Sequence, residues 1–118
     1  MIELIIAERC TLCGECAKIC PSNVFDVRPD APPVVARLED CQTCFLCELY
    51  CKADALYVGA DCEAARSIDV DQARASGTLG QYRRDSGWDE FEGDPRFANE
   101  HWRMEGVFAR ARDLARNR

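Results

Sequence analysis

Several features that mark common protein classes are scarce or missing in this sequence. Its 118 residues include one histidine, and no window approaches the roughly 18 apolar residues of a membrane-spanning helix. Residues 1–9 have no basic stretch, and their apolar part covers only residues 4–7, which does not fit a secretory signal. These absences predict a cytoplasmic protein without a membrane span, in a compartment where thiols stay reduced.

Motifs of catalysis are also missing. The sequence has no glycine-rich phosphate loop, no Ser–His–Asp set, no convincing pair of carboxylates, and no flavin or nicotinamide motif. The single histidine, His101, lies beside Trp102 in a segment with helical periodicity, so we expect it to serve packing or an interface. The chain is therefore expected to have no catalytic residues of its own.

Basic residues are outnumbered by acidic ones. The chain has 15 lysines and arginines against 21 aspartates and glutamates, which gives a formal net charge of −6. An acidic surface disfavours binding to nucleic acid or to an anionic membrane. It favours partner proteins with basic patches and encounter rates that depend on salt.

Cysteine, in contrast, is abundant, with nine residues in the chain. Eight of them form two copies of the pattern C-x2-C-x2-C-x3-C, placed 31 positions apart. The first copy is Cys10, Cys13, Cys16 and Cys20, and the second is Cys41, Cys44, Cys47 and Cys51. Four thiolates at this spacing are typical of a bacterial [4Fe–4S] site, so two copies predict two clusters and electron transfer.

Two other uses of these cysteines compete with iron–sulfur binding. A secreted disulfide scaffold does not fit a chain in which no secretory signal is recognised. A zinc-stapled interaction module uses C-x2-C pairs, but zinc does not require three cysteines plus a fourth in each copy. The ninth cysteine, Cys62, lies outside the pattern, and we expect it to be a small buried hydrophobic residue.

The repeat extends beyond the cysteines. A shift of 31 aligns residues 24–27 with residues 55–58, so each half reads as strand, cysteine loop, short helical turn and strand. The expected strands are short and rich in β-branched or aromatic residues, and they cover residues 2–6, 24–27, 34–38 and 56–58. Residues 28–33, which contain three prolines, read as a turn between the halves.

Residues 1–60 resemble the bacterial-type 2[4Fe–4S] dicluster ferredoxins. The first motif, Cys-Thr-Leu-Cys-Gly-Glu-Cys-Ala-Lys-Ile-Cys-Pro, ends at Pro21 and carries the resemblance most clearly. The family implies an α+β fold, a ferredoxin-like βαββαβ domain with a pseudo-twofold repeat, and one-electron transfer. The resemblance further implies that the fourth cysteine of each copy binds the cluster of the other copy. Cluster I then has the ligands Cys10, Cys13, Cys16 and Cys51, and cluster II has Cys41, Cys44, Cys47 and Cys20.

The second motif departs from the first at two positions, and neither change removes a ligand. Phe45 replaces Gly14, and Lys52 replaces Pro21. A lysine near cluster I favours its more negative reduced state, which raises the potential, but a solvated lysine without effect is an equal alternative. Phe45 either packs in the core, shields cluster II from water, or faces a partner.

Residues 61–118 form a C-terminal extension of different character, with loops and a terminal amphipathic helix. Asp69 and Gln72 predict the start of a short helix that ends near Ala75. Residues 76–93 read as a loop with aromatic anchors, which are Tyr82, Trp88 and Phe91. Asp94 and Pro95 predict the start of a helix of roughly twenty residues. Its apolar face consists of Phe97, His101, Met104, Phe108, Ala111 and Ala115.

The layout of a dicluster domain with an extension resembles the small iron–sulfur subunits of flavoprotein oxidoreductases, such as the adenylylsulfate reductase β-subunit. This resemblance implies that residues 61–118 wrap around a large flavoprotein subunit of the fumarate reductase/succinate dehydrogenase type, which holds FAD. Electrons then pass between an external carrier, the two clusters and the flavin. The alternative is a free ferredoxin whose extension folds back over residues 1–60. A sensor that binds DNA is disfavoured by the acidic charge.

Overall fold

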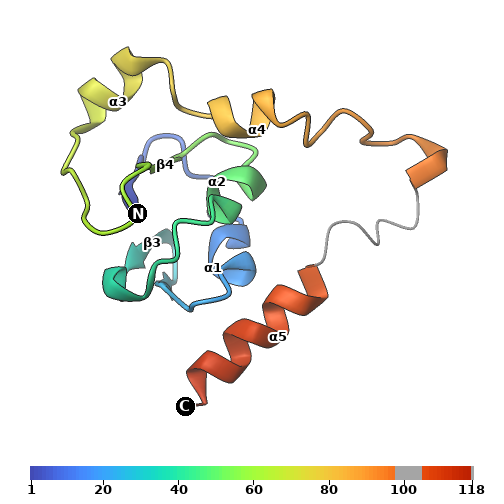
Figure 1. The fold of residues 1–118 in the computed structure, drawn as a ribbon, viewed down its shortest axis with the longest axis horizontal. Helices are drawn as coiled ribbons and strands as arrows, with labels where there is room; N and C mark the ends of the chain where they lie inside the picture. Colours follow the sequence, from blue (N-terminus) through green and yellow to red (C-terminus); the bar gives the residue numbers. More distant parts are fainter. Residues whose placement is uncertain (98–104, 118) are drawn as a thin grey trace.

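The computed structural model describes residues 1–97 and 105–117 (Figure 1). The chain is a small mixed α/β protein with short strands and helices, the class of fold that the sequence predicts. The elements of the first half of the chain are β1 (Ile2–Ile5), α1 (Glu15–Ile19), β2 (Phe25–Arg28), β3 (Ala31–Val35), the 3₁₀ turn η1 (Leu38–Asp40), α2 (Leu46–Tyr50) and β4 (Leu56–Val58). Those of the extension are α3 (Val70–Ser76), α4 (Gln81–Asp85), the 3₁₀ turn η2 (Pro95–Phe97) and α5 (Glu105–Arg116).

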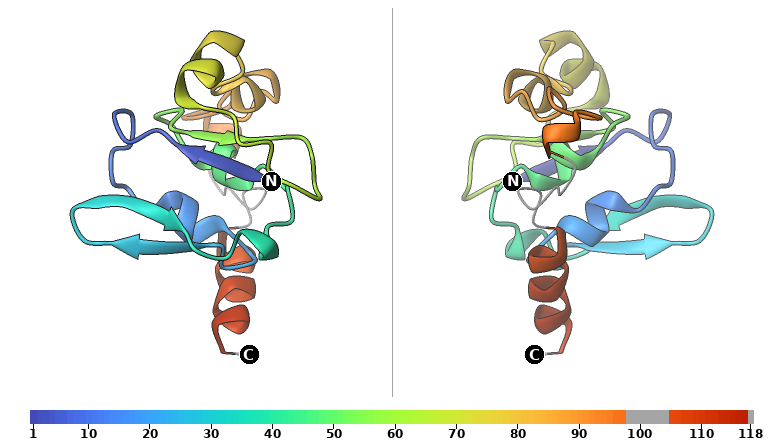
Figure 2. Two further views of the ribbon diagram at one scale, coloured as in Figure 1. Left: turned by 90° about the vertical axis from the view of Figure 1, so that its left-hand side faces the viewer. Right: turned by 90° about the vertical axis from the view of Figure 1, so that its right-hand side faces the viewer.

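Two antiparallel strand pairs organise residues 2–58. β1 pairs with β4, with Ile2 opposite Val58, and β2 pairs with β3. The first and last strands of this half of the chain are therefore joined, and the amino group of Met1 extends the junction by donating to the carbonyl of Gly59 at 2.8 Å. The β2–β3 hairpin projects from one side of the molecule (Figure 2).

The predicted boundary of β3 was wrong. The sequence predicts a turn over residues 28–33, but the turn is limited to Pro29 and Asp30, and β3 already begins at Ala31. Asp30 takes the left-handed backbone conformation, with φ 57°, that such a tight turn requires. Within the described chain β3 pairs only with β2, and the register of this pair shifts between Ala31 and Val34, opposite Pro32 and Pro33. A free edge and an irregular pairing are both places where a strand tolerates proline.

Helices α1 and α2 lie side by side and bring the two cysteine loops together (Figure 1). Ile19 of α1 packs against Leu49 and Tyr50 of α2, and all three are buried. A second apolar cluster, between the strands and the helices, consists of Ile2, Ala17, Cys20, Val24, Phe25, Leu56 and Val58. Its small size leaves the cysteines Cys16, Cys41, Cys47 and Cys51 in contact with the core.

The helix predicted after Asp69 is confirmed as α3. A capping box starts this helix. The backbone N–H of Gln72 donates to the carboxylate of Asp69 at 2.8 Å, and the backbone N–H of Asp69 donates to the side-chain oxygen of Gln72 at 3.0 Å. Ala73 of α3 and the nearby Leu79 pack on Ile6, which is fully buried. This part of the extension therefore covers the end of β1.

The prediction of a loop over residues 76–93 was wrong for α4. This helix has only five residues, and it starts at Gly80, which takes a left-handed conformation with φ 73°. Tertiary contacts stabilise it, which is why the local sequence does not reveal it. The predicted anchor Trp88 follows α4 and packs edge-on against Tyr50 of α2, with ring centroids 5.2 Å apart.

The described parts of the predicted terminal helix are a 3₁₀ turn and an α-helix. Pro95 starts the 3₁₀ turn η2, and α5 has twelve residues. The predicted face residues His101 and Met104, and Trp102, lie outside the described residues. α5 packs on α1 through Phe108, and Arg112 donates to the carbonyl of Lys18 at 2.8 Å. α3 and α4 lie on one side of residues 1–58, and α5 lies on the opposite side (Figures 1 and 2).

A pair of glycine substitutions tests the docking of α4. A Cβ built on Gly80 clashes with the Asp54 carboxylate, whereas no described atom lies within 4 Å of a Cβ on Gly77, which has a similar φ of 71°. We expect Gly77→Ala to lower the free energy of unfolding by about 1–2 kcal/mol through backbone strain alone. Gly80→Ala adds a steric clash of roughly 1–3 kcal/mol. Anaerobic unfolding followed by circular dichroism measures the difference, and equal losses contradict the described packing of α4 on Asp54.

No helix in the described part of the chain is both long enough and apolar enough to span a lipid bilayer.

Candidate iron–sulfur sites

One cavity of about 530 Å³ opens between the loop that precedes α1 and the end of α2. Four cysteines line it, and they are Cys10, Cys13, Cys16 and Cys51. The first three come from the first motif, whereas Cys51 is the last cysteine of the second motif and caps the C-terminus of α2. The space is large enough for a group much bigger than one ion or water.

A second, smaller cavity of about 20 Å³ lies next to the loop that precedes α2. The cysteines that line it are Cys41, Cys44, Cys47 and Cys20. Cys20 belongs to the first motif and caps the C-terminus of α1. The donor chemistry fits an iron–sulfur cluster at both cavities, but the second is narrow, so its loop has to widen to admit a cube.

The eight cysteines thus lie in the two groups that the resemblance implies, three from one motif and one from the other. Among the described residues, no three His, Cys, Asp or Glu side chains converge as ligands of a single metal ion. A [4Fe–4S] cube does not need such convergence, because each thiolate binds a different iron. The role of these cysteines as cluster ligands stays a prediction.

The backbone of the two cysteine loops repeats together with the sequence. Three positions in each half take the left-handed conformation, and each lies 31 residues from its counterpart. The pairs are Leu12 (φ 62°) with Thr43 (φ 52°), Gly14 (φ 75°) with Phe45 (φ 62°), and Asn23 (φ 56°) with Asp54 (φ 51°). Five of the six are not glycine, so the loops store backbone strain, which in proteins clusters at functional sites.

Phe45 shows how the second loop tolerates this strain. It starts α2 in the conformation that Gly14 supplies for α1. Phe45 packs against the apolar cluster between the strands and the helices, and its ring lies against that of Tyr82 of α4, with ring centroids 4.9 Å apart. This packing, one of the roles expected from the sequence, offsets the conformational cost of a bulky residue at positive φ.

Backbone N–H groups hold the two crossing cysteines in place. The Sγ of Cys20 accepts from the N–H of Val24 at 3.5 Å, and the Sγ of Cys51 accepts from the N–H of Ala55 at 3.3 Å. The two bonds occupy equivalent positions of the repeat. Such bonds orient each sulfur, and the bond from Ala55 lowers the pKa of Cys51.

Burial has the opposite effect on the thiols. It raises the pKa of Cys16 to about 12 and raises the pKa of Cys47 well above its ordinary value. Burial also raises the pKa values of Cys44 and Cys51. The chain alone therefore keeps these sulfurs protonated, and the charge of bound iron is needed to release the protons.

A buried carboxylate, Glu48, follows Cys47 in α2. It accepts from the N–H of Val58 in β4 at 3.1 Å and from the N–H of Tyr82 in α4. Burial raises the pKa of Glu48. Its counterpart in the first half is Ala17, so this link between α2, β4 and the extension exists only in the second half of the repeat.

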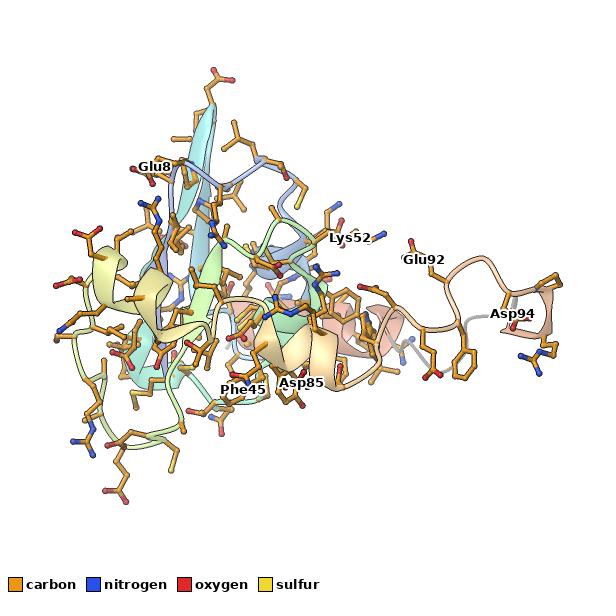
Figure 3. The ribbon with its side chains drawn as sticks, turned by 90° about the horizontal axis from the view of Figure 1, so that it is seen from above. Glu8, Phe45, Lys52, Asp85, Glu92 and Asp94 are labelled. Carbon is orange, nitrogen blue, oxygen red and sulfur yellow. The ribbon has the colours of Figure 1, made fainter. Side chains whose placement is uncertain are left out.

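Two basic side chains lie around the loop that contains Cys51, and they are Lys52 of this loop and Arg83 of the extension. Lys52 lines the first cavity and forms an ion pair with Glu92 of the extension at 2.8 Å, and the two side chains point toward one another in Figure 3. The carboxylate of Glu92 therefore offsets part of the lysine charge that the sequence places near cluster I. Lys52 is thus a largely exposed lysine with a carboxylate partner, and its effect on the potential stays a prediction.

Arg83 of α4 secures the same loop and was missed from the sequence. Its side chain is only 15% exposed, and it donates to the carbonyl of Lys52 at 3.4 Å and to the carboxylate of Asp54 at 3.3 Å. It also forms an ion pair with Asp89. One arginine in a segment that reads as loop carries no sequence signal for this role.

The prediction for Cys62 was wrong, because this cysteine is exposed.

Comparison with known proteins places the cysteine segment in a family. Residues 2–52 match the family model of the 4Fe-4S dicluster domain. A ferredoxin of Methanothermococcus thermolithotrophicus is 41% identical over 46 residues, which are 39% of this chain and 75% of that protein. An uncharacterized ferredoxin of Methanocaldococcus jannaschii is 44% identical over 46 residues, which are 39% of this chain and 73% of that protein. No solved structure matches the chain.

These findings define the class of the protein as an iron–sulfur protein of the 4Fe-4S type. The chain belongs to the dicluster ferredoxin family through its N-terminal segment. Ferredoxin-type 4Fe-4S electron transfer follows from this membership. The extension beyond residue 60 lies outside the matched segment.

Proposed function

We propose that the chain binds two [4Fe–4S] clusters with crossed ligands and transfers electrons through them. Cluster I is held by Cys10, Cys13, Cys16 and Cys51, and cluster II by Cys41, Cys44, Cys47 and Cys20. The observation that supports this most is that each cavity is lined by three cysteines of one motif and one of the other. The order of elements supports a βαββαβ ferredoxin domain over residues 1–60 with a pseudo-twofold repeat, followed by an extension over residues 61–118.

The protein contributes position and environment. When bound, the clusters supply one-electron oxidation and reduction, whose potential depends on hydrogen bonds, charge and exposure. α1 and α2 pack side by side and place both cavities against one core, which keeps the two sites adjacent. The N–H groups of Val24 and Ala55 fix the crossing sulfurs, and Arg83 fixes the loop after Cys51.

We further propose that the chain is the iron–sulfur subunit of a flavin-dependent oxidoreductase, with FAD in a large partner subunit and an external electron carrier. The extension supports this, because α5 leaves the apolar side chains Val107 and Leu114 exposed by 55% and 65%. These residues lie seven positions apart and so share one face of the helix. The net charge of −6 favours partners with basic surfaces.

A free ferredoxin carrier is the second candidate, and the packing of the extension favours it. Leu79 packs on Ile6, and Trp88 and Phe108 pack on α1 and α2, so the extension covers the ferredoxin half of its own chain. A covering of this kind stabilises a small domain without any partner.

Anaerobic purification of the tagged full-length chain from its own cells distinguishes the two candidates. A subunit is expected to elute with a flavin-bearing chain of flavoprotein size. The double substitution Val107→Asp and Leu114→Asp is expected to release that chain. Val27→Asp, which alters an exposed apolar residue of the β2–β3 hairpin, is the matched control and retains it. A flavin-free monomer with full iron content contradicts the subunit role and supports the carrier.

A further inference from the structure

One polar side chain at the second cavity has no partner within the described chain. Thr43 lies between Cys41 and Cys44, and its Oγ1 is fully buried without any hydrogen bond to a described residue. Thr43 lines the cavity together with the four cysteines of the second group. Because Thr43 lines this cavity, its hydroxyl is available as a hydrogen-bond donor to a group bound there.

The position of Thr43 carries two energetic costs. A buried hydroxyl without a partner loses about 1–3 kcal/mol of hydration that nothing replaces. Thr43 is also β-branched and has φ 52°, a conformation that such residues adopt rarely. Unsatisfied polar groups and strained backbones in native proteins are typical of ligand sites, and here both fall on one residue.

The first half of the repeat has no hydroxyl at the equivalent position. The counterpart of Thr43 is Leu12, which is 51% exposed. The neighbouring Thr11 lines the first cavity, but it is exposed, so water can satisfy its hydroxyl. A buried hydroxyl without a described partner is therefore one of the differences that set the second site apart from the first.

We propose that the Thr43 hydroxyl donates a hydrogen bond to a sulfur of cluster II and raises the reduction potential of this cluster relative to cluster I. The inference rests on the proposed binding of two clusters. Reduction adds one negative charge to the cluster, and a donor to sulfur stabilises that added charge, so the reduced form gains more than the oxidised form. This hydrogen bond therefore shifts the distribution of an added electron toward cluster II.

Removal of this one hydroxyl tests the inference in the full-length holoprotein. Thr43→Val keeps the shape of the side chain and removes the donor, Thr43→Ser restores a donor, and Thr11→Val makes the same chemical change at an exposed threonine. Each variant is titrated anaerobically with a reductant, and both midpoint potentials are read by electron paramagnetic resonance. Iron and sulfide are counted in the same samples.

We expect Thr43→Val to lower one midpoint, so that the ratio of reduced to oxidised cluster at a fixed potential falls about tenfold, or roughly 59 mV for one electron. Thr43→Ser restores the midpoint, and Thr11→Val moves neither. If Thr43→Val fails to load cluster II, loading of Thr43→Ser supports the role of the hydroxyl, and failure of both overturns it. Unchanged midpoints, or equal shifts of both, also overturn the inference. Absence of clusters from the unmodified protein is a separate result, which contradicts the proposed function itself.

Discussion

Substitution of Cys20 by alanine leaves the chain with about half of its iron, because it removes one ligand of one [4Fe–4S] cluster. Cys20 follows α1 in the first half of the chain, yet it lines the cavity of the second motif. We therefore expect the loss of cluster II, with cluster I retained. Cys51→Ala is expected to have the mirror effect, since Cys51 lines the cavity of the first motif.

Alkylation of free thiols, mapped by peptide mass spectrometry, identifies which cluster is lost. Crossed ligation predicts that Cys20→Ala makes the three other cysteines of the second group reactive, and these are Cys41, Cys44 and Cys47. Ligation within each motif predicts reactivity of Cys10, Cys13 and Cys16 instead, and this outcome contradicts the proposed ligand sets. Cys62→Ala is the control, because this exposed cysteine lies outside both cavities, and it is expected to leave the iron content unchanged.

Removal of iron is expected to unfold residues 1–60. The two sheets have two strands each, and isolated strand pairs are marginally stable in water. The core between strands and helices is small and includes cysteine side chains, so the domain has little apolar burial to hold it without clusters. Metal binding then supplies much of the folding free energy.

Far-ultraviolet circular dichroism before and after anaerobic chelation measures this dependence. We expect a large loss of the folded signal, and an equal amount of iron-saturated chelator is the control. The loss should be accompanied by rapid proteolysis within residues 1–60. An unchanged spectrum after complete removal of iron shows that the chain folds without clusters and contradicts this expectation.

Local sequence signals predicted much of the first half of the chain and the start of the extension. Strands β1, β2 and β4 lie within one or two residues of their predicted positions, because β-branched and aromatic runs are bounded by turn residues. The helix α3 could be predicted because its capping box is a local sequence signal. β3 was misplaced because prolines suggest a turn, whereas the strand tolerates them through a free edge within the described chain and an irregular pairing with β2.

The elements and residues that the sequence did not reveal depend on tertiary contacts. α4 has five residues and is stabilised by the contacts of Arg83 with the loop after Cys51. Glu48 is identified as a buried link only when β4 and α4 are seen around it. Thr43 differs from an ordinary loop residue only because its hydroxyl is buried without a partner. In contrast, the resemblance that the repeated cysteine motif carries already implied the grouping of the cysteines that line the two cavities.

Elemental analysis of anaerobically prepared protein tests whether the eight cysteines hold two iron–sulfur clusters. We expect about eight iron atoms and about eight inorganic sulfides per chain, with a paramagnetic signal after reduction by dithionite. Colourless protein that contains zinc, lacks inorganic sulfide and gives no paramagnetic signal shows that the cysteines do not hold these clusters.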